Sequence, residues 1–95
     1  MKFTIILEPI DGEGYTTYCP VLPGCVSEGN TLDMALSTMS EYMGFTLAIR
    51  HQEGYQIPQE TTDIIVQEIT RILQERSDAG LPLTIETREV EIDLP

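Results

Sequence analysis

The chain has 95 residues, of which 41% are hydrophobic, and its 16 acidic and five basic side chains give a formal net charge of −11 at pH 7. This length allows one modest hydrophobic core, and the apolar fraction is too high for a disordered chain. The sequence has no run of about 18 apolar residues, which argues against a membrane-spanning helix. Its strand-like start argues against a cleaved signal peptide. We therefore expect a cytoplasmic protein that does not bind a membrane.

The negative charge is spread over the whole chain. Residues 1–59 hold seven acids and two basic residues, a net −5, and residues 60–95 hold nine acids and three arginines, a net −6. Both parts would repel a phosphate backbone, and neither has the basic stripe of a nucleic-acid binder. The charge suits a basic protein partner, whose encounter rate it would raise. The alternative is that it serves solubility alone.

Three short strands are predicted in the first third of the chain. Apolar and polar residues alternate over residues 2–9, which is the period of a strand with one buried face. Residues 11–14, Asp-Gly-Glu-Gly, have the composition of a hairpin turn. Residues 15–19 are β-branched and aromatic, and residues 25–28 form a third strand. With such short connections the three should make an antiparallel meander.

From Leu32 the apolar period changes to that of a helix, which is predicted over Leu32–Leu47. Its apolar stripe holds Leu32, Ala35, Leu36, Met39, Met43 and Leu47. Gly44 is unfavourable inside a helix and could permit close approach of a strand or of a second subunit. The methionines at 34, 39 and 43 fit core filling better than an adaptable binding face.

Two further elements are predicted after the first helix. Residues 55–57 could form a short fourth strand, and a second helix should run from position 61 or 62 to about Asp78. The apolar side of this helix holds Ile65, Ile69, Ile72 and Leu73. Arg71 and Glu75 are four residues apart and should pair on its solvent face.

The tail from Leu83 to Leu94 has a divided apolar pattern. Leu83 and Ile85 occupy odd positions, whereas Val90, Ile92 and Leu94 occupy even ones. A flat strand cannot turn both sets to one face. The pattern predicts a bulge within 87–89 or a change of partner sheet there, with the last part pairing with another subunit or covering a sheet edge.

The most informative segment is Tyr18–Leu36, with the sequence YCPVLPGCVSEGNTLDMAL. Its prolines at 20 and 23 fix φ and push their preceding residues toward extended geometry. Asn30 and Thr31 are candidate N-caps ahead of the helical run. The segment therefore predicts a strand end, a rigid corner, a short strand and a capped helix.

This order of residues resembles the signature of HicB-like antitoxins, which is an aromatic strand, Pro-Asp-Leu-Pro-Gly-Cys, Gly-Asp-Thr and a helix beginning Glu-Glu-Ala. Here Val21 and Asn30 stand in place of aspartates, and Asp33-Met34 in place of two acids. Residues 54–58, Gly-Tyr-Gln-Ile-Pro, resemble the family's Gly-X-X-Ile-Pro exit, so the resemblance covers roughly residues 1–60. It implies an α+β fold related to a partial RNase H: an antiparallel three- to four-stranded sheet with a helix on one face, here followed by a second helix and a C-terminal strand.

We read residues 1–95 as a single domain, with a HicB-like β-β-β-α core at 1–60 and a helix–strand extension at 61–95 that could serve oligomerisation. Exposed sheet edges and the divided tail favour a homodimer or homotetramer. Many HicB-like proteins add a helix-turn-helix or ribbon-helix-helix segment. The order of helix and strand here does not match either one, so direct contact with nucleic acid is not expected.

The resemblance implies a non-catalytic module that masks a small basic ribonuclease toxin of HicA type. The predicted partner-binding residues are Tyr18, Val21, Leu22, Glu28, Asn30 and Asp33. The acids would mimic the charge of RNA, with Tyr18 or Leu22 as an apolar anchor, although both could equally be core residues. The alternative is a stand-alone homo-oligomer without a toxin.

The sequence lacks the motifs of a catalytic site, and we expect neither enzyme activity nor a cofactor. The single histidine, His51, fits a solvated residue better than a general base. A metal-dependent nuclease is disfavoured because the carboxylates do not converge on a central strand. A small-ligand site beside the corner is a further, less favoured alternative. Cys19 and Cys25 cannot form a four-ligand zinc site with one distant histidine, and we expect reduced, structural thiols.

Overall fold

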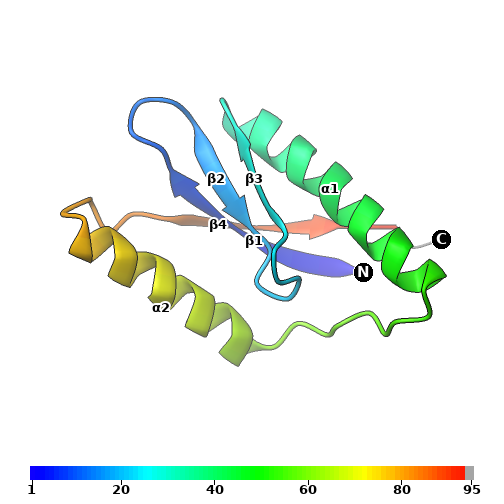
Figure 1. Cartoon of the computed structure of the whole chain (residues 1–95). Helices are drawn as coiled ribbons and strands as arrows, with labels where there is room; N and C mark the ends of the chain where they lie inside the picture. The colour runs from blue at the N-terminus through cyan, green and yellow to red at the C-terminus, as the bar shows by residue number, and fades with distance from the viewer. Residues whose placement is uncertain (94–95) are drawn as a thin grey trace.

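A four-stranded antiparallel sheet lies between two helices in the computed structural model, which describes residues 1–93 (Figure 1). The elements in chain order are β1 (Lys2–Pro9), β2 (Tyr15–Tyr18), β3 (Val26–Gly29), α1 (Leu32–Gln52), α2 (Thr62–Asp78) and β4 (Glu86–Glu91). The strand order is β3-β2-β1-β4, and every neighbouring pair is antiparallel. The predicted α+β class, three-strand meander and two helices are therefore confirmed.

Helix α1 packs its predicted apolar stripe on one face of the sheet, which we call the α1 face. The Thr31 hydroxyl caps the helix by accepting a hydrogen bond from the Met34 N–H at 3.1 Å. The helix continues beyond the predicted end at Leu47 to Gln52. The core on this face consists of Phe3, Ile5, Leu7, Cys19, Val21, Leu22, Cys25, Ala35, Met39, Met43, Leu47 and Ile92.

Helix α2 covers the opposite, α2 face of the sheet. Side chains alternate along β1, so Ile6 points away from the α1 core, and both Ile6 and Ile72 of α2 are fully buried. Ile65, Ile69 and Leu73 of the predicted α2 stripe are half-buried. Because β1 is covered on both faces, Ile6 interrupts the apolar–polar alternation of this strand.

The predicted short strand at 55–57 is wrong, because this segment is an irregular connection between the helices. Ile57 packs against the α1-face core. Nearby, the Glu60 carboxylate accepts hydrogen bonds from the Thr4 hydroxyl at 2.9 Å and the Thr4 N–H at 2.5 Å. The ladder between β1 and β2 ends at the Ile6–Tyr18 pair. Beyond this pair, the Glu60 side chain, and not a further residue of β2, accepts the hydrogen bond from the Thr4 N–H.

The tail pairs with β1 of the same chain, which corrects the predicted bulge or change of partner sheet. The register is continuous from Lys2–Glu91 to Leu7–Glu86, without a bulge or a change of partner. Leu83 lies before the strand and is 62% exposed, so its odd position does not conflict with the even set. β4 covers the edge of β1, which is one of the two roles predicted for the tail. Because β4 is itself at the edge of the sheet, its pairing with another subunit stays a prediction. Leu94 lies outside the described residues.

The helix–strand extension predicted at 61–95 thus contributes β4 to the same sheet as the strands of the 1–60 core. Division of the chain at residue 60 stays a prediction.

Two glycines provide a test of the packing around α1. A Cβ at Gly29 would overlap the backbone of Ala35, whereas a Cβ at Gly44 would meet open space within the chain. Gly44 therefore does not serve close approach of a strand; its predicted role toward a second subunit stays a prediction. We expect Gly29→Ala to lower the free energy of unfolding by about 1–3 kcal/mol through overpacking. Gly44→Ala should raise it by about 1 kcal/mol through helix propensity. Urea denaturation measures both, and a neutral Gly29→Ala would contradict the close β3–α1 contact.

Candidate partner-binding site

The corner, residues 19–25, is a compact double turn between β2 and β3. The Cys19 N–H donates to the Cys25 carbonyl at 3.2 Å, while the Leu22 N–H donates to the Cys19 carbonyl at 3.1 Å and the Cys25 N–H to the Leu22 carbonyl at 3.0 Å. Gly24 has a φ of +81°, which favours glycine at the reversal. Leu22 is 1% exposed and anchors the corner in the α1-face core. Pro23 and Gly24 form its exposed tip.

The two thiols of the corner are free and buried in the core. Burial, and next the neighbouring Cys25, raise the pKa of the Cys19 thiol to about 12. Burial also raises the pKa of Cys25. Both groups are protonated at neutral pH and act as small apolar side chains.

The buried thiols should make the protein less stable at alkaline pH. The unfolded chain releases the Cys19 proton above its ordinary pKa of 9.0, whereas the folded chain retains it up to about 12. The contribution of this thiol to the free energy of unfolding is therefore complete below about pH 9. Between about pH 9 and the folded pKa of about 12 it falls by about 1.4 kcal/mol per pH unit. Urea denaturation between about pH 8 and 11 measures the slope. Cys19→Ala should make the slope shallower without abolishing it, because the pKa values of Cys25 and Tyr18 are also raised in the folded chain. An unchanged slope in this variant would contradict the prediction.

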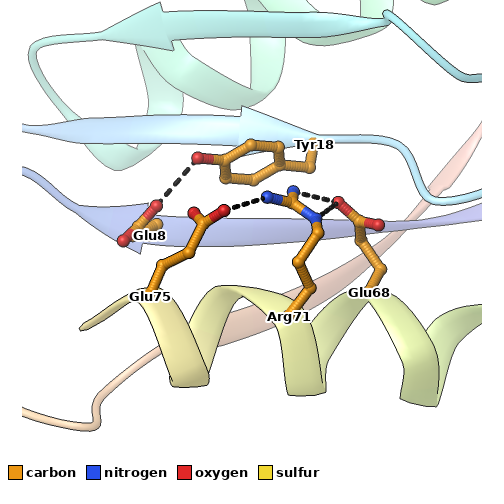
Figure 2. Close-up of polar contacts among 5 residues, drawn as sticks. All are labelled: Glu8, Tyr18, Glu68, Arg71 and Glu75. Atoms are coloured by element: carbon orange, nitrogen blue, oxygen red, sulfur yellow. Dashed lines mark hydrogen bonds and ion pairs between the residues drawn. The ribbon is translucent and has the colours of Figure 1, made fainter. Parts of the chain in front are cut away.

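Tyr18 stands at the end of β2 on the α2 face, where it meets side chains of α2 (Figure 2). Its hydroxyl donates to the Glu8 carboxylate at 2.8 Å, and the Arg71 guanidinium lies over its ring, 5.6 Å from the centroid. Burial, and next the hydrogen bond to Glu8, raise the pKa of Tyr18 well above its usual value. The phenol is therefore a fixed donor at neutral pH.

Arg71 is held by two carboxylates of its own helix. Its Nη1 donates to Glu75 at 2.9 Å and its Nε to Glu68 at 3.0 Å, and its Nη2 also contacts Glu68. These bonds, that to Glu68 first, raise the pKa of Arg71. The predicted Arg71–Glu75 pair is confirmed, but Arg71 lies over the ring of Tyr18 and not on the predicted solvent face of the helix. Glu68 is a second partner that the sequence did not predict.

A hollow of about 300 Å³ opens between the corner and α2. We call it the corner hollow. It is lined by Tyr18, Cys19, Pro20, Leu22, Pro23, Gly24, Cys25, Val26, Glu68 and Arg71. Val26 at its rim is 45% exposed. The hollow thus combines an apolar wall from the corner with a charged wall from α2, and its size fits one side chain of a partner or a small ligand.

The six residues predicted to bind a partner fall into two groups. Tyr18, Val21 and Leu22 belong to the corner, where Val21 and Leu22 are buried core residues and only Tyr18 is partly accessible. Glu28, Asn30 and Asp33 are exposed around the connection from β3 to α1. Tyr18 pairs with Val26 at one end of β3, while Glu28 and Gly29 lie at the other end. The four accessible residues stay predicted partner contacts.

Sequence reasoning missed the part of the site that α2 supplies. Glu68 and Arg71 line the hollow beside Tyr18, although 50 residues or more separate them from it in the chain. Their spacing on the helix predicted a charged face, but it could not predict which strand lies opposite that face. Only the return of α2 across the sheet brings them together (Figure 1).

Among residues 1–93, no three His, Cys, Asp or Glu side chains are grouped closely enough to hold one metal ion. Neither helix within these residues is long and apolar enough to cross a membrane.

The sequence comparison identifies the family. No protein-family model matches the chain. The UPF0150 protein ssr1765 of Synechocystis sp. is 33% identical over 70 residues, which cover 73% of this chain and 85% of that protein. The chain belongs to the UPF0150 family.

Solved structures show that this UPF0150 chain has a HicB-like fold. The antitoxin HicB of Burkholderia pseudomallei matches 99% of the chain with a TM-score of 0.67 and 23% identity, and the chain spans 64% of its length. A chain of the HicA3 and HicB3 toxin–antitoxin complex matches with a TM-score of 0.62 and 23% identity, covering 98% of this chain and 99% of that one. A chain of the toxin–antitoxin complex from Streptococcus pneumoniae gives a TM-score of 0.68 at 18% identity, with 98% and 69% covered. The recognised HicB resemblance is thus confirmed for the fold.

Proposed function

We propose that this UPF0150 protein is a non-catalytic antitoxin that binds a small basic ribonuclease toxin and masks its RNA-binding surface. The HicB-like fold supports the proposal, because two of the similar structures are toxin–antitoxin complexes. The net charge of −11 suits a basic partner.

The observation that carries the proposal is the excess of accessible carboxylates. Three of the four arginines, Arg71, Arg76 and Arg88, form ion pairs with acids of the same chain. The exposed acids are Asp11, Glu13, Glu28, Asp33, Glu41, Glu53, Asp63, Glu75, Asp78, Glu89, Glu91 and Asp93. A basic partner therefore meets a surface whose own cations are largely engaged, and its attraction extends over about a Debye length.

The first contact area that we propose is the connection from β3 to α1. Glu28 and Asp33 place two carboxylates there, with the polar Asn30 between them, and all three are exposed. Charged residues at such a rim chiefly raise the association rate and align the partner.

The second contact area is the corner hollow, which would receive one side chain of the toxin. The accessible part of Tyr18 and the exposed Val26 offer apolar surface, and Glu68 offers a carboxylate to a basic group. Central anchors in pockets commonly dominate the binding energy of an interface. In this proposal the β3–α1 acids align the toxin and the hollow retains it.

Capture from the native host tests the proposal. The tagged wild-type protein should retain a small basic protein at low salt and release it as salt rises. Glu28→Lys with Asp33→Lys should weaken binding of that purified partner at least tenfold, because it reverses two proposed contacts.

The matched control is Glu89→Lys with Asp93→Lys, which alters two exposed acids of the β4 region. Each double variant exchanges two negative charges for two positive ones, so the net charge goes from −11 to −7 in both. Equal weakening by the two variants would show a general charge effect and contradict the proposed contact area. Recovery of the chain alone would favour the stand-alone homo-oligomer.

A further inference from the structure

The guanidinium of Arg71 is surrounded by groups that suit a guanidinium of any origin. It lies between the carboxylates of Glu68 and Glu75, which precede and follow it on α2 by three and four residues. It also lies over the ring of Tyr18 (Figure 2). Two carboxylates and an aromatic face together satisfy the hydrogen bonds, the charge and the flat surface of this group. We call Tyr18, Glu68 and Glu75 the guanidinium site.

The guanidinium site is held in place without its arginine. The Tyr18 hydroxyl donates to Glu8 at 2.8 Å, and Glu8 in turn accepts a hydrogen bond from Arg76 at 3.2 Å. This chain of contacts fixes the ring at its far end. Glu68 and Glu75 are seven residues apart, about two helical turns, so they share one side of α2. The position of the ring and the spacing of the two carboxylates therefore do not depend on Arg71.

Arg71 itself is only weakly retained. Its side chain is 45% exposed and that of Glu75 is 60% exposed, so water screens their attraction. A long side chain on a helix surface also regains rotamer freedom when it turns to solvent. The corner hollow of about 300 Å³ opens beside it and is lined by Tyr18, Glu68 and Arg71. A side chain that enters the corner hollow thus arrives next to the guanidinium site.

We infer that Arg71 is a stand-in for an arginine of the protein partner, which enters the corner hollow, displaces Arg71 and binds the guanidinium site. This inference rests on the proposed function and names the group that the hollow receives. An arginine fits better than a lysine because its planar fork bonds two carboxylates and stacks on the ring, whereas an ammonium is compact and strongly hydrated. The exchange leaves the carboxylates paired, while Arg71 moves into water.

The stand-in limits the affinity of the free protein for its partner. Only the fraction of molecules in which Arg71 has left the site is competent to bind, and the apparent dissociation constant rises in proportion. Removal of Arg71 should therefore strengthen partner binding. A residue that contacted the partner directly would have the opposite effect when removed, so the sign of the change separates the two roles.

A small guanidinium compound tests the site without any protein partner. Ethylguanidinium would be titrated into Arg71→Ala and followed in NMR spectra through the backbone amides of Tyr18 and Glu68. We expect saturable binding to this variant and at least fivefold weaker binding to the wild type, in which Arg71 competes. Ethylammonium, a probe of the same charge, should bind the variant at least fivefold more weakly. Absence of saturation, equal binding of the two probes, or equal binding to variant and wild type would overturn the inference.

A second substitution checks where the probe binds. Adding Glu68→Gln to Arg71→Ala removes one of the two carboxylates of the guanidinium site and should weaken ethylguanidinium binding at least fivefold. Unchanged binding in this double variant would place the probe elsewhere and would also overturn the inference. Circular dichroism checks that the single and double variants are folded.

Arg88→Ala is the matched control for partner binding. Arg88 is 42% exposed and pairs with Glu86 on β4. Loss of either arginine takes the net charge from −11 to −12, so general attraction to a basic protein increases equally. The captured basic protein should bind Arg71→Ala at least fivefold more tightly than Arg88→Ala. Equal affinities, or weaker binding of Arg71→Ala, would overturn displacement. Failure to capture any basic protein would contradict the antitoxin proposal alone, because the ethylguanidinium titration decides the site independently.

Discussion

Arg76→Ala should lower the free energy of unfolding by about 3–5 kcal/mol, the effect expected when one partner of a buried ion pair is removed. The Arg76 side chain is 6% exposed. It donates to Glu8 and to the Pro9 carbonyl, both at 3.2 Å, and to the Pro82 carbonyl at 2.6 Å. The alanine variant would leave a carboxylate that is only 18% exposed without its cation and would detach α2 from β1 and from the segment before β4.

Arg71→Ala is the control for the loss of an arginine from the same helix. The Arg71 side chain is 45% exposed and forms ion pairs only with acids of its own helix. Its contact with the Tyr18 ring is likewise partly exposed, so we expect the variant to lose only about 1 kcal/mol. Urea denaturation of both variants measures the difference. Equal effects would show that Arg76 does not fix α2 to the sheet.

Leu22→Ala should have the second large effect, about 2–5 kcal/mol of lost stability. Leu22 is 1% exposed, fills the α1-face core, and both donates and accepts a backbone hydrogen bond inside the corner. Truncation would leave a cavity beneath the wall of the corner hollow. The loss should appear in denaturation curves and, if the hollow retains a toxin, as weaker binding at temperatures where the variant is folded.

Pro23→Ala distinguishes anchoring by Leu22 from rigidity of the corner. Pro23 is exposed at the tip, and we expect its replacement to cost less than about 1 kcal/mol, mainly through the freedom gained by the unfolded chain. A Pro23 variant as unstable as Leu22→Ala would mean that backbone rigidity, rather than side-chain burial, holds the corner.

Local patterns predicted most of the fold. The spacing of three and four along α1 and the period of two over β1 each follow from the way one element faces the α1-face core, so neighbouring residues carry enough information. Ile6 departs from the period of β1 because α2 covers the second face of this strand. The end of α2 at Asp78 was also predicted, since Gly80 and Pro82 disfavour a longer helix.

The failures have a common physical origin in contacts between distant segments. Ile57 suggested a strand, but the hydrogen bonds of Thr4 that a strand could have satisfied go to the Glu60 side chain. Leu83 suggested a bulge because nothing local shows where β4 begins. The burial of Leu22 and Val21, two of the predicted contact residues, likewise depends on how the corner folds onto α1.

The candidate site was predictable only in its exposed acids. Glu28 of β3 and Asp33 of α1 lie on the surface as the sequence suggested, because charged side chains are seldom buried. The corner hollow could not be predicted from the sequence, because its charged wall comes from α2. A helix with Glu68, Arg71 and Glu75 on one side would normally face solvent. Here the Arg71 guanidinium instead lies over the ring of Tyr18 (Figure 2).

Inhibition of ribonuclease activity is the most direct test of the antitoxin proposal. The basic protein captured from the native host would be purified away from this chain and assayed on RNA with increasing amounts of the chain. We predict that the basic protein cleaves RNA alone and that cleavage stops when the two proteins are equimolar at low salt. Cleavage that persists at excess of this chain, or a basic partner without ribonuclease activity, would contradict the proposal.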